Sequence, residues 1–437
     1  MVRVTDMTHG RPIRLILLFS LPLMLGSVFQ QLYTIVDTII IGRGVGMQAL
    51  ASIGAADWIN WLVLWGLQGF TQGFAILAAQ EFGAGAYDRL RRVLAMIVKL
   101  SCWFGIAVTI ISLLLVRPLL TLLHTDPAVF GGAQTYLYVQ FGGSLIIIAY
   151  NMAAAVLRCL GDSRTPLFAI IAASFANIAL DLLFVMGFGW GIFGASFATV
   201  LAQLIAFLLC LRSLRRLPFV QLTKADWKTD PAILLHLCRL GIPTGLQMSM
   251  ITLGGMVLQS VLNGFGVVFV AGYTAANKLY GILESASVAF GYAMTAYMGQ
   301  NLGARNAARI DAGIRAVLVL SAEFTAAIVT AMLVAGKPLL GLFLSTEEAG
   351  AADALAVAYQ YLMVLMAFLF ALFMLQAYRS SLQGLGEMTV PTLSGFAEML
   401  MRMGAALVLP TFIGQSGVFF AEGAAWVCAA ALNLVWY

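Results

Sequence analysis

The 437-residue sequence contains few charged residues. Asp, Glu, Lys and Arg together make up 10% of it, whereas 62% of the residues are hydrophobic. A soluble domain carries about 25% charged residues. A chain with so little charge cannot cover a water-exposed surface, so lipid must be its solvent. Its apolar stretches are continuous, as at residues 93–116, which excludes the alternating pattern of a membrane β-barrel and predicts helices.

Other absences narrow the function. The five cysteines show no CxxC spacing, so we interpret them as buried apolar residues and not as metal ligands or disulfides. The three histidines fall near expected loops, so a proton pathway would have to use carboxylates. No GxxxxGK[ST] motif occurs, which excludes ATP as the direct energy source. The spans contain no catalytic constellation, so we expect neither an enzyme nor a cofactor.

An internal repeat is present. LRCLGDSRTP at residues 157–166 matches LQGLGEMTVP at 382–391, with Leu, Leu-Gly, an acid and Pro in equivalent positions. In each half a proline, Pro22 or Pro243, opens a long apolar run. Both runs end in a Gln followed three residues later by a Gly, at 80–83 and 300–303. Duplicated apolar halves are typical of secondary transporters.

Apolar runs between turn residues predict twelve membrane spans, six in each half. The expected spans are 15–42, 49–80, 93–116, 131–157, 165–187, 190–212, 235–263, 267–300, 313–335, 354–380, 391–413 and 415–437. The first run is too long for a signal peptide. The predicted fold class is an all-α polytopic membrane protein with twelve transmembrane helices in two six-helix lobes.

The arrangement of the lobes follows from the number of spans and the charges. Because six is even, both lobes enter the membrane from the same side, and a pseudo-two-fold axis along the membrane normal relates them. We expect an N-lobe over 1–212, a cytoplasmic linker over 213–234 and a C-lobe over 235–437. Most of the 24 Lys and Arg residues lie at the N-terminus or around the loops after even-numbered spans. The positive-inside rule therefore places both termini on the cytoplasmic side of the plasma membrane. The +5 net charge reflects this orientation and not nucleic-acid binding.

Two acids in the first half are the main functional candidates. An ionisable side chain at the centre of a span costs about 3 kcal/mol, so each such residue is expected to have a structural or functional role. Asp37 and Asp181 each lie about 8 Å below the outer end of their span. Tyr33 and Asn177 stand one turn before them, and Thr199 enters the sixth span to a similar depth. These oxygen-bearing groups predict a site for a proton or Na⁺. The alternative, that each Asp is structural, stays open.

Four further charges and one proline have less decisive interpretations. Glu398 and Arg402 are four residues apart, which favours a structural, self-neutralising pair. Lys278 and Glu284 are equally consistent with a helix–helix contact and with the wall of a substrate cavity. Pro22 lies within a span, where it bends a helix. The sequence is consistent both with a static kink at Pro22 and with a hinge whose bending depends on the charge of Asp37.

Several runs resemble the multidrug and toxic compound extrusion (MATE) transporters, over essentially the whole chain. They are LPLMLGSVFQQLYTIVDTIIIGRGVGMQALASIG, GFTQGFAILAAQEFGAGAYDRLRR, LRCLGDSRTP, YMGQNLGARN and GLGEMTVPT. The resemblance implies export of amphipathic, often cationic organic molecules in exchange for Na⁺ or H⁺. Asp37 matches the family's helix-1 acid. Asp181, Asn177 and Thr199 match additional residues of prokaryotic, DinF-like members, and Pro22 matches a proline proposed there to bend with protonation.

We therefore expect a secondary active exporter that works by alternating access. Its expected partners are small amphipathic substrates and the lipid bilayer, with one chain acting as a monomer. Two alternatives remain: a lipid-linked oligosaccharide flippase of the same superfamily, which needs fixed cations facing a central cavity, and an ion channel. Asp, Asn and Thr serve H⁺ and Na⁺ equally, so the sequence does not choose the ion.

Overall fold

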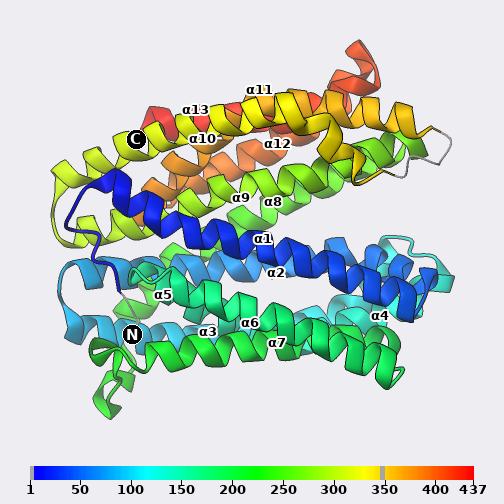
Figure 1. Cartoon of the computed structure of the whole chain (residues 1–437). Coiled ribbons are helices and arrows are strands. Elements are labelled where there is room, and N and C mark those ends of the chain that lie inside the picture. The colour runs from blue at the N-terminus through cyan, green and yellow to red at the C-terminus, as the bar shows by residue number, and fades with distance from the viewer. Residues whose placement is uncertain (1–3, 345–349) are drawn as a thin grey trace.

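The computed structural model describes residues 4–344 and 350–437, which form long helices in two bundles (Figure 1). The first bundle consists of α1 (Pro12–Gly44), α2 (Met47–Gly83), α3 (Tyr87–Leu122), α4 (Pro127–Gly142), α5 (Ser144–Cys159), α6 (Arg164–Asp181) and α7 (Gly191–Leu214). The second consists of α8 (Pro231–Asn263), α9 (Val267–Gly303), α10 (Ala307–Gly341), α11 (Ala351–Gly384), α12 (Thr389–Ile413) and α13 (Phe420–Trp436). No strand occurs within the described ranges.

Most of these helices suit a membrane. Ten of the described helical segments are long and apolar enough to span one, and the bent pair α4–α5 makes an eleventh. The remaining long helix, α9, has 37 residues but is more polar, because Asn277, Lys278 and Glu284 interrupt its apolar run. With α9 as the twelfth, the helices correspond one to one with the expected spans. The predicted all-α polytopic fold is confirmed.

Two spans differ from the expected continuous helices. The span expected at 131–157 is bent by 50° between Gly142 and Ser144, where two adjacent glycines weaken the helix. The span expected at 165–187 is α-helical only to Asp181, after which Leu182–Gly187 forms a π-helical turn. Such wider turns are rare and occur frequently at functional sites.

The two bundles meet closely where α2 and α9 end. A Cβ atom added to Gly83 would lie 1.9 Å from the carbonyl oxygen of Gln300, and one added to Gly303 would lie 1.9 Å from that of Gln80. Only glycine permits this approach of two backbones. We call this part of the molecule the crossing end.

Hydrogen bonds at the crossing end are reciprocal. Gln80 Nε2 donates to the carbonyl oxygen of Gly384 at 3.2 Å, and Gln300 Nε2 donates to that of Cys159 at 2.9 Å. Each glutamine thus crosses to the other bundle. Gly384 and Cys159 occupy equivalent positions in the repeat, so the two contacts are related by the internal two-fold symmetry.

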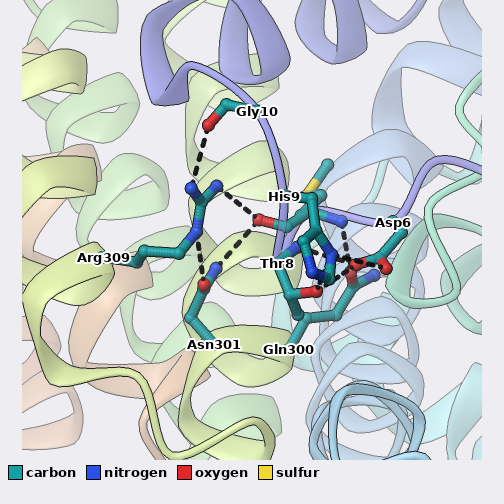
Figure 2. A network of polar contacts seen from close by, with 8 residues as sticks. Asp6, Thr8, His9, Gly10, Gln300, Asn301 and Arg309 are labelled. Carbon is teal, nitrogen blue, oxygen red and sulfur yellow. Dashed lines mark hydrogen bonds and ion pairs between the residues drawn. The ribbon is translucent and has the colours of Figure 1, made fainter.

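The segment before α1 adds a second connection at the crossing end. The backbone N–H of Thr5 donates to Gly161 of the first bundle at 3.0 Å. Two residues later, the N–H of Met7 donates to Gln300 Oε1 of the second bundle at 2.8 Å. Figure 2 shows how Arg309 then holds the segment by donating to the carbonyl oxygen of Met7 at 2.9 Å. The N-terminal segment therefore binds both bundles together.

α1 runs between the bundles and packs on both (Figure 1). Near its start, Ile16 and Phe19 belong to the hydrophobic core of the second bundle. Near its end, Ile40 and Ile41 pack with residues of the first bundle. Pro22 lies between these two sets of contacts, within an unbroken helix.

Gly83→Ala tests the crossing. The added methyl group would overlap backbone atoms that cannot rotate away, and overpacking costs about 1–3 kcal/mol. We expect a lower melting temperature for the purified variant than for the wild type. Gly54→Ala in the same helix is the control, because nothing lies within 4 Å of a Cβ atom at that position. Equal melting temperatures for both variants would contradict a tight crossing.

Candidate functional site

The two acids predicted from the sequence face each other across the contact between α1 and α6. The carboxyl groups of Asp37 and Asp181 are neighbours that interact with one another. Close packing of the two helices brings them together. A Cβ atom at Gly26 would be 3.5 Å from Leu167 of α6, and one at Gly44 would be 2.6 Å from Met186 in the π-helical turn. The outer end of α1 is thereby held beside Asp181.

The other predicted residues surround a small cavity beside this pair. Its volume is about 20 Å³, enough for a water molecule or a small ion. Tyr33 of α1, Asn177 of α6 and Thr199 of α7 contribute to its lining. Gln203, one turn after Thr199, also lines it and was not predicted. The structure thus brings all five predicted residues into one region of the first bundle.

The acidic pair has no donor to compensate it. Asp181 is fully buried. Within the described residues, no hydrogen-bond partner reaches Asp37 Oδ1, either carboxylate oxygen of Asp181, or either side-chain amide atom of Asn177. No described Lys, Arg or His forms a salt bridge with either acid. Buried acceptors without a donor are costly, so this geometry favours a bound proton or small cation.

The donor set fits a hard cation in chemical terms. Carboxylate, amide and hydroxyl oxygens are ligands of the type that Na⁺ accepts. The described residues contain no group of three or more His, Cys, Asp or Glu side chains that could hold a metal ion. A site for a multivalent metal is therefore not indicated there. A shared proton, or one Na⁺ with neutral oxygens completing its shell, suits the pair.

Sequence reasoning missed a third acid in this region. Asp57 on α2 lies close enough to Asp37 for a direct charge–charge interaction. It also interacts with Tyr136 of α4, whose hydroxyl group accepts a hydrogen bond from Asn60 at 3.3 Å. Asp57 lies inside an expected span, and that alone marks an acid as a functional candidate.

In the second bundle the buried charges neutralise each other. Glu398 accepts from Arg379 at 2.6 Å and from Arg402 at 3.0 Å. Arg402 also pairs with Glu422 at 2.8 Å and donates to the carbonyl oxygen of Ile251 at 3.0 Å. The expected Glu398–Arg402 pair is thus part of a four-residue network. Arg379 is not among the residues predicted from the sequence, and its pairing with Glu398 keeps it 3% exposed.

Lys278 and Glu284 on α9 do not join this network through a salt bridge in the described part of the chain. The Lys278 side chain is exposed, and that of Glu284 is partly buried. Glu284 is close to the Tyr280 hydroxyl group and to the carboxylate of Glu422. Neither residue contacts the acidic pair of the first bundle.

Solved structures with this architecture are membrane transporters. A transporter of the MOP superfamily from Pyrococcus furiosus superposes with a TM-score of 0.90 over 99% of this chain and 97% of its own, at 24% identity. A multidrug resistance MATE family transporter in an outward-facing conformation also gives a TM-score of 0.90, with the same coverage and 23% identity. These likenesses define the class of fold: an all-α polytopic membrane protein in two bundles.

Sequence comparisons identify the family. The MatE family model matches residues 22–183 and 243–408, once in each half. A probable multidrug resistance protein of Bacillus subtilis, YpnP, is 33% identical over 83% of this chain and 80% of its own length. The multidrug export protein MepA of Staphylococcus saprophyticus is 22% identical over 96% and 92%. The chain belongs to the MATE family, as its sequence resemblance indicated.

Glu398→Gln tests the role of the second bundle's charge network. The substitution removes the negative charge of Glu398, with which two buried arginines pair. Breaking a buried ion pair costs about 3–5 kcal/mol. We expect a clearly lower melting temperature and less monodisperse protein on size-exclusion chromatography.

The matched control for that test is Glu323→Gln. Glu323 is an exposed acid on α10, and its neutralisation should change stability by no more than about 0.5 kcal/mol. If both variants melt like the wild type, the network does not stabilise the bundle.

Proposed function

We propose that this protein is a secondary active exporter that exchanges amphipathic, often cationic, organic molecules for H⁺ or Na⁺ by alternating access. The observation that carries the proposal is the Asp37–Asp181 pair without a donor, in which Asp181 is fully buried and Asp37 is partly buried. A proton or cation bound there relieves the cost of two facing carboxylates. The names of the multidrug relatives support the substrate class.

Ion binding can drive transport only if the two end states bind the ion with different affinity. α1 provides a physical route for such a difference. It carries Asp37 on the half that packs against the first bundle, and its other half is part of the second bundle's core. A change in charge at Asp37 changes how α1 packs on α6. Pro22, between the two halves, is the position where α1 bends most easily.

The direction of exchange follows from the joined crossing end. The N-terminal segment and the inter-bundle linker both lie at this end (Figure 1), and the positive-inside rule assigns it to the cytoplasm. The conformation described is then the outward-facing one. Access from the cytoplasm requires breaking the two reciprocal glutamine contacts and the contacts of the N-terminal segment.

The buried charges also bear on the alternatives. A flippase for a pyrophosphate-linked lipid needs unpaired cations facing a central space. Arg379 and Arg402 are both paired with Glu398, which leaves Lys278 as the exposed cation within α9. The acids of the first bundle favour a cationic substrate instead. A channel would need no buried acidic pair of this kind.

Asp37→Asn is the decisive variant. The assay is efflux of a cationic dye from proteoliposomes under an imposed pH gradient or an imposed Na⁺ gradient. We expect the rate of efflux to fall by about 5- to 150-fold, the factor that corresponds to typical coupling free energies. The gradient that drives the wild type identifies the ion.

Asp311→Asn is the control, because it removes the same charge from an exposed position on α10. It should transport like the wild type. Full transport by Asp37→Asn with an unchanged gradient dependence would overturn the proposal, and steady ionic current through the wild-type protein would favour a channel.

A further inference from the structure

One face of α2 carries an acid, two indole rings and two amides in a single row. Asp57, Trp61, Trp65, Gln68 and Gln72 are spaced three or four residues apart, so they lie on one side of the helix. We call this row the α2 stripe. An acid followed by aromatic side chains within a membrane-spanning helix is costly unless it serves binding.

The α2 stripe faces the second bundle. At its inner end, Gln68 and Gln72 donate to the hydroxyl group of Tyr292 on α9, at 2.8 and 3.3 Å. Asn60, on a neighbouring side of α2, bonds to Tyr136 of the first bundle, with which Asp57 also interacts electrostatically. Figure 1 shows α2 running through the middle of the molecule, between the bundles. Because Trp61 and Trp65 share the side of α2 that carries Gln68 and Gln72, helical geometry directs them toward the second bundle as well.

Farther from the crossing end, the stripe is uncovered. Trp61 and Trp65 are 46% and 44% exposed, although the same face is occupied by Tyr292 only one turn away. Asp57 is also partly exposed. Two large aromatic rings and a carboxylate thus lie along one side of α2 with part of each side chain exposed. Trp61 also packs edge-on against Trp58, with 5.4 Å between the ring centroids.

The charge at the outer end of the stripe is not neutralised by the protein. Within the described chain, no salt bridge involves Asp57. Asp57 interacts electrostatically with Asp37 and is thus a neighbour of the acidic pair.

We propose that Asp57, Trp61 and Trp65 form a subsite for the positive charge and flat ring of a planar aromatic monocation. The carboxylate compensates the charge, and the indole faces attract it further and stack on the ring. This inference rests on the proposed export function and names its substrate class. It also accounts for exchange, because a cation beside Asp57 and an ion on the Asp37–Asp181 pair repel each other and weaken each other's binding.

The test is equilibrium binding to purified protein in phosphatidylcholine nanodiscs, without any gradient. The probes are 10-methylacridinium, a planar cation, and 10-methylacridone, a neutral ring of similar size. Asp57→Asn should raise the Kd for the cation by about tenfold or more and leave that for the neutral probe within about twofold. Asp57→Glu, which keeps the charge, should restore most of the affinity for the cation.

Trp61→Leu provides an independent readout, because it removes the aromatic face without changing the charge. It should raise the Kd for the cation by about fivefold and also weaken binding of the neutral ring. Asp311→Asn should leave both constants unchanged.

The outcomes separate this inference from the proposed function. If Asp57→Asn binds both probes like the wild type, or weakens both equally, the subsite is wrong even when Asp37→Asn still loses gradient-driven transport. If wild-type transport ignores both gradients, the exporter proposal fails while the binding comparison stays interpretable.

Discussion

The rest of the structure depends on the close approach of α2 and α9 at the crossing end. Gly83 and Gly303 have no side chains, so the two backbones touch, and the glutamines beside them satisfy carbonyl groups of the opposite bundle. The contact is made twice, related by two-fold symmetry. It sets the angle at which one bundle faces the other. It also directs the α2 stripe toward the second bundle, while α1 has core contacts with both bundles.

The described salt bridges neutralise Glu398 in the second bundle but do not reach the acidic pair of the first bundle. In the second bundle, Glu398 has two arginine partners, and a change in its protonation would break a network that stabilises the fold. In the first bundle, Asp37 and Asp181 face each other without a donor, and the exporter proposal assigns a proton or cation to that pair. On this proposal the second bundle has a fixed charge distribution and the first has a variable one. The response to an ion is then local, and the remainder of the molecule can move as a rigid body.

The sequence was informative where local spacing determines structure. The repeat and the continuous apolar runs predicted the spans, and counting from the helix ends placed Asp37 and Asp181 at one depth. Features that depend on distant partners were missed. The position of Asp57 inside a span could have marked it as a candidate, but its nearness to Asp37 on another helix appears only in the structure. Arg379 lies near the end of a span, where a surface position is the simplest expectation, but its salt bridge with Glu398 keeps it buried. The π-helical turn after Asp181 leaves no compositional signal, because an extra residue in one helical turn needs no particular side chain.

The polarity of α9 has a consequence for synthesis of the protein. Asn277, Lys278 and Glu284 make this helix too polar to qualify as a span on its own, and charged residues near a helix centre oppose transfer from the translocon into lipid. α9 packs most extensively against α11, which the ribosome makes later. The counterpart helix α2 is apolar enough to insert unaided. We therefore expect the two halves to insert differently, with transfer of α9 into lipid depending on its packing against α11.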